Sequence, residues 1–452
     1  MSKRPATDDE LMPPPGSSVR VPASYLPCKT FQGPRPGYFF RLGDTGPGYY
    51  VDRVARDAAT RAMPPPPKRR KNAQELLADA EAEAGFTAGG GSGRGTESNA
   101  FADDSTVLDE TGLRKLVLQF ERRYAANQQL RLKHPHSPEK FVDSEVDLDE
   151  SLRALSGLAG YPELYPEFCR LNAVPSILGL LSHDNPDISA HALELLHELT
   201  DADSVESHEQ GGLALVTSFV KESGYEVLLA SLVRFSKNEL NSSEDANAVH
   251  HGLGIVENVL EIDPEQVGEM VARCDGGLPV WILKRATRSF GKKNAGDDDS
   301  VDDVRSYAAE VLAILCQTDN NEVKLLIGKD GGIDRLLRAV APYKKKDPTN
   351  ESEREWLENV FDAQCACLAL PENRDLFVQN EGLELMLLLM RSKKHVRVAA
   401  IKTTDHALTN HKTGSERFVD ALGLKSAFSA FMGKGTSFIS QFPPPCFDDC
   451  PE

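Results

Sequence analysis

The stretch Asn172–Thr200, which reads NAVPSILGLLSHDNPDISAHALELLHELT, decides the fold of this chain. The apolar residues of its second half recur at helical spacing: Ile188, Ala192, Leu195, Leu196 and Leu199. A helix gathers all of them on one stripe, and that stripe has to be buried. Asn185 suits the N-cap and Pro186 suits the first helical position, so this helix should begin at Pro186.

A shorter apolar helix precedes it and should end at Ser182. Its buried face is marked by Val174, Ile177, Leu178 and Leu181. Only a few polar residues separate the two helices, and amphipathic helices joined this tightly pack antiparallel. The stretch therefore predicts a helical hairpin.

The same pair of helices recurs down the chain behind a third, leading helix, and each repeat turns sharply at a small residue. The turns are Asn172-Ala173, Ser223-Gly224, Asp275-Gly276-Gly277, Asp330-Gly331-Gly332, Asn380-Glu381-Gly382 and Leu422-Gly423. Glycine at such a junction allows a positive φ that other residues resist. The junctions lie roughly 40 to 55 residues apart, which is typical of armadillo or HEAT repeats. No strand-like alternation follows Asp103, so the sequence predicts an all-α, right-handed superhelical solenoid.

Composition narrows the class of partner. The 452 residues contain 51 Lys and Arg against 69 Asp and Glu, a net charge of -18. This charge repels nucleic-acid phosphates and favours basic peptides as partners, with no direct nucleic-acid binding. The N-terminus MSKRPATDDE has no apolar core for a signal peptide, and the longest apolar run, Leu385–Met390, is too short to cross a bilayer. We expect a soluble intracellular protein without a membrane contact.

The sequence divides into four parts. Residues 1–105 form a Pro- and Gly-rich arm that should be disordered, because it has few apolar residues to bury. Within the arm, the aromatic segment Gly33–Asp52 predicts either a small hairpin or docking peptide or a merely disordered segment, and both stay open. Residues 106–160 should form a helical cap, 161–432 the armadillo-like repeats, and 433–452 an atypical Pro-rich tail.

Within the arm, four prolines precede four adjacent cations, Lys68, Arg69, Arg70 and Lys71. Prolines hold a chain extended, which is the form in which import receptors bind basic signals. The run is a candidate nuclear localisation signal. A solvated charge cluster is the alternative.

The sequence also predicts where a helix begins in the cap and how the last repeat ends. In the cap, Ser137 suits an N-cap and Pro138 the first residue of a second helix. At the other end, helices near Ser415–Ala421 and Leu424–Met432 should form a last repeat without a third helix. Such an end is either a truncated gene model or a genuine short form, and it should aggregate through its exposed apolar face.

We find no pattern of catalytic residues. P-loop, HExxH, GxSxG and kinase signatures are absent from the sequence. The eight cysteines lack the spacing of a zinc site or a disulfide framework, and the neighbours His250 and His251 point in different directions on a helix. We expect a non-enzymatic protein with no cofactor and no metal.

Polar residues of the third helices are the candidate partner-binding residues, because third helices line the concave face of a solenoid. The selected set is Glu198, Glu257, Asn258, Glu358, Asn359 and Asp405. Acids pair with Lys and Arg, and Asn amides bind a peptide backbone. The alternative is that these residues are simply the solvated face of each helix.

Long segments of the chain resemble the β-catenin-like protein 1 family. Residues 116–155 read LVLQFERRYAANQQLRLKHPHSPEKFVDSEVDLDESLRAL, residues 162–189 read PELYPEFCRLNAVPSILGLLSHDNPDIS, and the likeness extends from Leu113 to Met432. The resemblance implies a nuclear, armadillo-like protein of the spliceosome-associated nineteen complex that binds basic localisation-type segments of partner proteins. Where the family's pattern continues beyond Met432, this sequence departs from it, so any partner or dimer site placed there is in doubt.

An importin-α-like cargo adaptor, which would bind import receptors, is the alternative. The binding groove of importin-α resembles a ladder of Trp and Asn side chains from successive third helices. This chain has only two Trp residues, Trp281 and Trp356. Only Trp356 falls on a third helix, with Asn359 three residues on. The sequence therefore favours the splicing scaffold, and a homo-oligomer stays open.

Overall fold

The computed structural model describes residues 25–27, 38–43, 46–51, 108–288, 302–329, 331–392 and 395–432. The chain divides into two units, Met1–Thr96 and Glu97–Glu452. Each unit is described by itself below.

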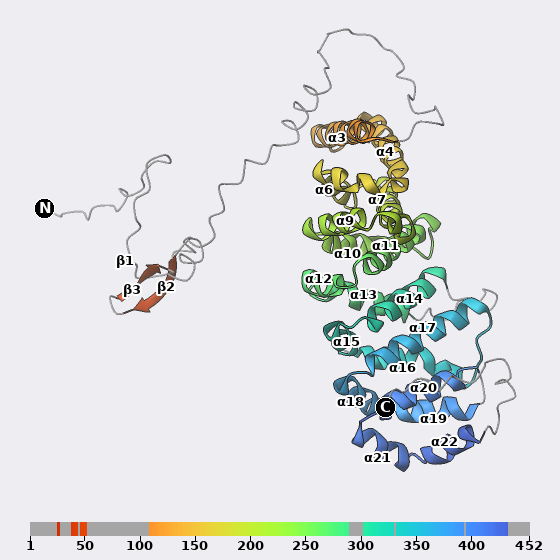
Figure 1. Ribbon diagram of the computed structural model, residues 1–452. Coiled ribbons are helices and arrows are strands. Elements are labelled where there is room, and N and C mark those ends of the chain that lie inside the picture. Colours follow the sequence, from red (N-terminus) through yellow and green to blue (C-terminus); the bar gives the residue numbers. More distant parts are fainter. Residues whose placement is uncertain are drawn as a thin grey trace, which may run out of the picture. The chain divides into compact units, whose positions relative to one another are not determined.

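The first unit contains three short antiparallel strands, β1 Tyr25–Pro27, β2 Tyr38–Gly43 and β3 Gly46–Val51, in the order β1-β3-β2 (Figure 1). Gly43 pairs with Gly46 and Tyr38 with Val51, so β2 and β3 form an antiparallel hairpin. For the segment Gly33–Asp52, the structure shows the small hairpin rather than a disordered segment. The predicted disorder of the remaining arm and the basic run 68–71 lie outside the described residues.

The second unit begins with a helical cap, α3 Glu110–Lys133 and α4 Val142–Leu155, which pack on each other. Asp109 caps α3 by accepting the N–H of Gly112 at 2.7 Å. The expected helix start at Ser137 and Pro138 is only partly right: Pro138 begins the 3₁₀ turn Pro138–Lys140, but the Ser137 side chain makes no capping bond and α4 begins only at Val142. Phe141 follows this turn, is buried, and has Arg131 over its ring, so burying this side chain delays α4 until Val142.

The remaining helices form repeats of a first, a second and a third helix (Figure 1). The first helices are α5 Tyr165–Arg170, α9 Glu209–Lys221, α12 Gln266–Arg273, α15 Asn321–Gly328, α18 Pro371–Gln379 and α21 Lys412–Asp420. The second helices are α6 Ala173–Leu180, α10 Gly224–Phe235, α13 Gly277–Ala286, α16 Gly332–Val340, α19 Gly382–Ser392 and α22 Gly423–Phe431. The third helices are α7 Pro186–Thr200, α11 Ser243–Ile262, α14 Asp303–Gln317, α17 Glu351–Cys367 and α20 Arg397–Leu408.

Shorter segments connect these helices. They are the one-turn helix α8 Ala202–Val205 and the 3₁₀ turns Ser156–Gly160, Pro162–Leu164, Glu206–His208 and Ala341–Lys344. No strand occurs among the described residues from 108 onward. The predicted all-α armadillo-like solenoid is confirmed, and α7 begins at Pro186 with the Asn185 side chain accepting the Asp187 N–H at 3.0 Å, as expected.

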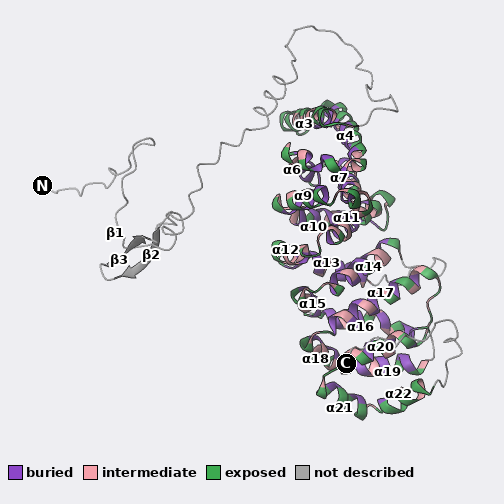
Figure 2. Cartoon of the chain, viewed as in Figure 1, coloured by how far each residue is buried: buried purple, intermediate pink, exposed green. Residues whose placement is uncertain are grey.

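The third helices pack in one row, α7 on α11, α11 on α14, α14 on α17 and α17 on α20. We call these five helices the third-helix row. Their inner faces share one continuous apolar core with the first and second helices, which Figure 2 shows as buried residues along the stack. Trp356, Tyr165 and Phe377 are among its largest fully buried side chains. No helix in the described part of the chain is both long and apolar enough to cross a membrane.

The backbone φ is positive at all six predicted junctions. The residues are Asn172 (64°), Ser223 (65°), Asp275 (49°), Gly276 (73°), Gly331 (80°), Glu381 (58°) and Leu422 (60°). Among the described junction residues, glycine itself takes the positive φ only at Gly276 and Gly331. The expectation that glycine supplies the turn is therefore wrong at the Ser223, Glu381 and Leu422 junctions, and the Asn172 junction contains no glycine. At those three junctions the glycine follows the residue with positive φ and begins the second helix.

Candidate partner-binding surface

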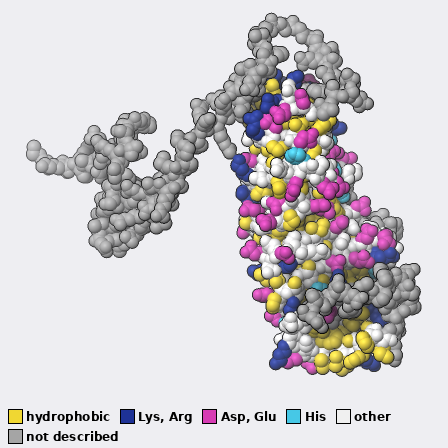
Figure 3. All heavy atoms as spheres, in the orientation of Figure 1, with side chains coloured by type: hydrophobic (Ala, Val, Ile, Leu, Met, Phe, Trp, Pro, Cys, Tyr) yellow, Lys and Arg dark blue, Asp and Glu magenta, His cyan; other side chains and the backbone are white. Residues whose placement is uncertain are grey.

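The third-helix row is acidic at its N-terminal half. Helices α7 and α11 together contain seven Asp and Glu and no Lys or Arg. The next helix, α14, has one Arg, and its guanidinium carbon lies 3.8 Å from the centre of the Trp356 ring. Figure 3 shows acidic side chains over much of the visible face, with basic ones gathered at the end formed by α3. The row from α7 to α14 thus carries uncompensated negative charge.

Three of the predicted binding residues lie on this part of the row. Glu198 is half-buried, and its Oε2 has no hydrogen-bond partner among the described residues. The Glu257 carboxylate accepts a hydrogen bond from the Tyr307 hydroxyl. Asn258 donates from its amide to the carbonyl of His197 at 3.3 Å, so this side chain joins α11 to α7 and is partly occupied within the protein.

The acids repel one another across the repeats. Burial raises the pKa of Glu310, and the neighbouring carboxylates of Glu257 and Glu355 raise it further. Glu194 and Glu310 are both exposed, and no described cation pairs with either of them. A positive charge placed here would relieve this repulsion.

The other three predicted residues lie on α17 and α20, where the acids are partly compensated. Glu358 lies 3.2 Å from Nε2 of His395. Asn359 is half-buried and Asp405 is exposed. Between them Lys402 donates to Asp362 at 2.7 Å. The structure therefore spreads the six residues over two regions of the row, of which the α7–α14 region is the more negative.

Trp356 does not reach this surface. Its ring is 1% exposed and its indole N–H donates to the carbonyl of Ala286 at 2.9 Å. A buried Trp that is satisfied inside the core cannot serve as a rung of a peptide-binding ladder. The importin-α-like ladder is therefore missing from the one third helix that has a Trp.

Sequence reasoning missed four ring side chains of the same region: His197 on α7, His250 and His251 on α11, and Tyr307 on α14. The sequence correctly indicated that His250 and His251 diverge, since the planes of their rings are 86° apart. It did not find their partners, which lie in other repeats. A search for rings on the exposed stripe of every third helix would have found them.

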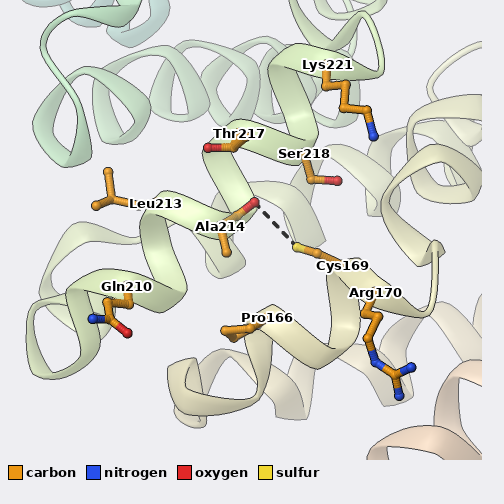
Figure 4. Close-up of a pocket in the computed structure, with 9 residues that line it drawn as sticks. All are labelled: Pro166, Cys169, Arg170, Gln210, Leu213, Ala214, Thr217, Ser218 and Lys221. Atoms are coloured by element: carbon orange, nitrogen blue, oxygen red, sulfur yellow. Dashed lines mark hydrogen bonds between the residues drawn. The ribbon is translucent and has the colours of Figure 1, made fainter. Parts of the chain in front are cut away.

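A cleft of about 670 Å³ lies on another face, between α5 and α9 (Figure 4). Cys169 is the one cysteine among the nine lining residues, and its thiol donates to the Ala214 carbonyl at 3.6 Å. Burial raises the pKa of this thiol to about 11, so it is protonated and a poor nucleophile at neutral pH. The lining residues provide no base for it. The described residues also contain no group of three or more His, Cys, Asp and Glu that would hold a metal.

Comparison with known proteins agrees with this architecture. The sequence profile of the family described as "Catenin-beta-like, Arm-motif containing nuclear" matches residues 95–441. Beta-catenin-like protein 1 of Homo sapiens is 40% identical over 327 residues, which cover 72% of this chain and 55% of that protein. The Beta-catenin-like protein 1 homolog of Schizosaccharomyces pombe is 36% identical over 332 residues, 73% of this chain and 56% of that protein. The chain thus spans about half the length of the curated relatives it matches.

Among solved structures, the crystal structure of an engineered protein is similar with a TM-score of 0.40 at 18% identity, over 67% of this chain and 97% of that one. We draw nothing from so distant a likeness. The two sequence relatives do carry an argument. Sequence identity of 36% to 40% over most of the repeat region indicates common descent rather than a shared architecture alone. The chain belongs to the catenin-beta-like, Arm-motif-containing nuclear family.

Proposed function

We propose that this chain is a non-catalytic nuclear scaffold that binds basic segments of partner proteins, and that these partners are subunits of the spliceosome-associated nineteen complex. The observation that carries the proposal is the charge of the third-helix row. Seven acids on α7 and α11 meet no Lys or Arg on the same helices. A long row of repeats with such a surface suits an extended, positively charged segment.

The binding region in this proposal is the stretch from α7 to α14. Glu194 and Glu310 are exposed acids of this stretch, and Glu198 and Glu257 are half-buried. On α17 and α20 the His395 ring and the Lys402 ammonium already contact the acids Glu358 and Asp362. A basic segment therefore gains more by lying across α7, α11 and α14.

Affinity purification from nuclease-treated nuclear extract tests this proposal. The bait is the tagged full chain, beside a variant with Glu194→Lys and Glu310→Lys. We expect nineteen-complex subunits with the wild type and a loss of about tenfold or more with the double variant, since two attractive exposed pairs become repulsive. A control with Glu209→Lys and Glu372→Lys makes the same charge change on first helices, at exposed positions of α9 and α18.

The control variant should recover the same partners as the wild type. Equal loss with both variants would mean that net charge, not the third-helix row, governs binding, and would contradict the proposal. Recovery of import β-receptors with varied cargo would replace the scaffold by a cargo adaptor. Binding that does not weaken as salt rises would also count against an exposed ionic surface.

A further inference from the structure

Four rings form a continuous strip across three third helices. The ring centres of His197 and His251 are 5.3 Å apart with planes 20° apart, and those of His250 and Tyr307 are 4.4 Å apart with planes 23° apart. His250 and His251 join the two stacked pairs at 6.3 Å, edge to face. We call these four side chains the ring strip. It runs from α7 over α11 to α14, within the acidic part of the third-helix row.

Gly254 lies beneath the strip. A β-carbon at this position would overlap the imidazole of His197 and stand 3.1 Å from the Tyr307 hydroxyl oxygen. The two rings therefore close over α11 only because residue 254 has no side chain. The strip is a packed feature of the fold rather than four independent surface residues.

The rings of the strip are uncharged at neutral pH. Burial lowers the pKa of His197, His250 and His251 below the ordinary value of histidine. Burial also raises the pKa of Tyr307, and its hydrogen bond to the Glu257 carboxylate raises it further. Four neutral π systems thus lie among carboxylates that attract cations.

Those carboxylates come from each of the three helices. Glu194 of α7 is close enough to His251 to act on its charge, and Glu257 of α11 acts on His197 and His250. Glu310 of α14 stands beside Glu257. A cation that lies on the rings is therefore near an acid from each of the three helices.

We infer that the ring strip is a subsite that selects arginine over lysine in the basic segment bound by the third-helix row. A guanidinium is planar and weakly hydrated, so it stacks on ring faces while its N–H groups bond carboxylates at the edge. An ammonium is a compact, strongly hydrated charge that gains little from neutral imidazoles. The inference rests on the proposed function, which concerns basic segments in general.

The test uses two synthetic peptides of one sequence that differ only in having arginine or lysine at every basic position. Their affinities for the full chain are measured by isothermal titration calorimetry at neutral pH. We expect the arginine peptide to bind about five- to tenfold more tightly, the range that stacking of a cation on rings provides. His250→Ala, an exposed position that leaves the core intact, should reduce this ratio towards one by weakening the arginine peptide alone.

A second variant, His251→Ala, removes the ring stacked on His197 and should have the same effect. The matched control is His406→Ala, which removes a half-buried imidazole of α20 outside the strip and should keep the wild-type ratio. Equal binding of the two peptides to the wild type would overturn the inference while leaving the proposed function intact. If neither peptide binds, the proposed function itself fails.

Discussion

A β-carbon on Gly382 would stand 2.7 Å from the ring of Phe377. The glycine begins α19 and the ring belongs to α18, so the first and second helices of this repeat meet with no room between them. The same relationship joins Phe219 to Gly224 at 2.6 Å and Phe418 to Gly423 at 2.5 Å. The glycines of these junctions serve a close approach of two helices rather than the sharp turn itself.

We predict that Gly382→Ala destabilises the chain by about 1–3 kcal/mol, because a buried, fully packed ring has to move to admit a methyl group. The φ of Gly382 is not positive, so no backbone strain contributes. Urea unfolding followed by circular dichroism measures the effect. Unchanged stability would mean that the ring of Phe377 relaxes freely.

Glu381→Gly should act in the opposite direction. Glu381 holds a φ of 58°, which costs a side-chain-bearing residue about 1 kcal/mol or more and costs glycine almost nothing. The same unfolding experiment should show a gain of up to about 1 kcal/mol, reduced by the greater freedom of glycine in the unfolded chain. A loss of stability would contradict our account of this junction.

These junctions also show how far the fold could be predicted. The helices of each repeat follow from local spacing, and the cap of α7 by Asn185 was found because N-capping depends on adjacent residues. The role of Gly382 could not be found in this way, because the constraint comes from a ring packed against it. Ser137 failed as a cap for a similar reason, since the burial of Phe141 redirects the chain.

Glu353 provides a prediction on pH. Its buried carboxylate accepts hydrogen bonds from the Tyr343 hydroxyl at 2.5 Å, from Lys346 Nζ at 2.8 Å and from the backbone and hydroxyl of Thr349 at 2.6 and 2.8 Å. Burial alone would raise its pKa, but these donors outweigh it and lower the pKa from 4.5 to about 2. A group whose pKa is depressed by folding stabilises the protein above its unfolded pKa, and this contribution is lost as the pH falls through the folded pKa.

Glu353→Gln should therefore cost on the order of 3 kcal/mol at neutral pH, and the difference from wild type should shrink between pH 4.5 and about 2. Urea midpoints at pH 7 and pH 3 measure both effects. Glu355→Gln, at an exposed position of the same helix, is the control and should show no such pH dependence. A constant difference at both pH values would show that the charge of the Glu353 carboxylate is not what stabilises its contacts with Tyr343, Lys346 and Thr349.

Helix α22 presents apolar side chains to solvent, with Phe428 64% and Phe431 87% exposed. Figure 3 shows the apolar patch at this end of the second unit. We predict that Phe428→Ser with Phe431→Ser reduces concentration-dependent association of this chain in light scattering, because exposed aromatic surface favours contact between copies. Leu132→Ser, at an isolated position of α3 that is 82% exposed, should leave association unchanged. Equal association of the wild type and the variant with both serine substitutions would contradict the prediction.

The candidate site was only partly accessible from the sequence. Acids on third helices can be counted without a structure, and Glu198 and Glu257 were selected as candidates by this means. Whether an acid is free or compensated depends on contacts between repeats, such as the bond of Lys402 to Asp362. The ring strip depends wholly on such contacts, because each stacked pair joins residues of different repeats.

The run Lys68-Arg69-Arg70-Lys71 remains a prediction, and it can be separated from every property of the solenoid. In a fluorescent fusion of the full chain, alanine at these four positions should shift the protein from the nucleus to the cytoplasm, since a family described as nuclear requires a route of entry. Lys344→Ala with Lys345→Ala removes exposed cations from the repeats and should leave the distribution unchanged.

A partner bound to the third-helix row could also carry the protein into the nucleus, so residues 60–75 fused alone to the fluorescent protein provide the decisive comparison. If this short segment fails to concentrate its cargo in the nucleus, the run is only a solvated charge cluster. If it succeeds while the full-length alanine variant stays nuclear, entry has two routes, and combining that variant with Glu194→Lys and Glu310→Lys should close both.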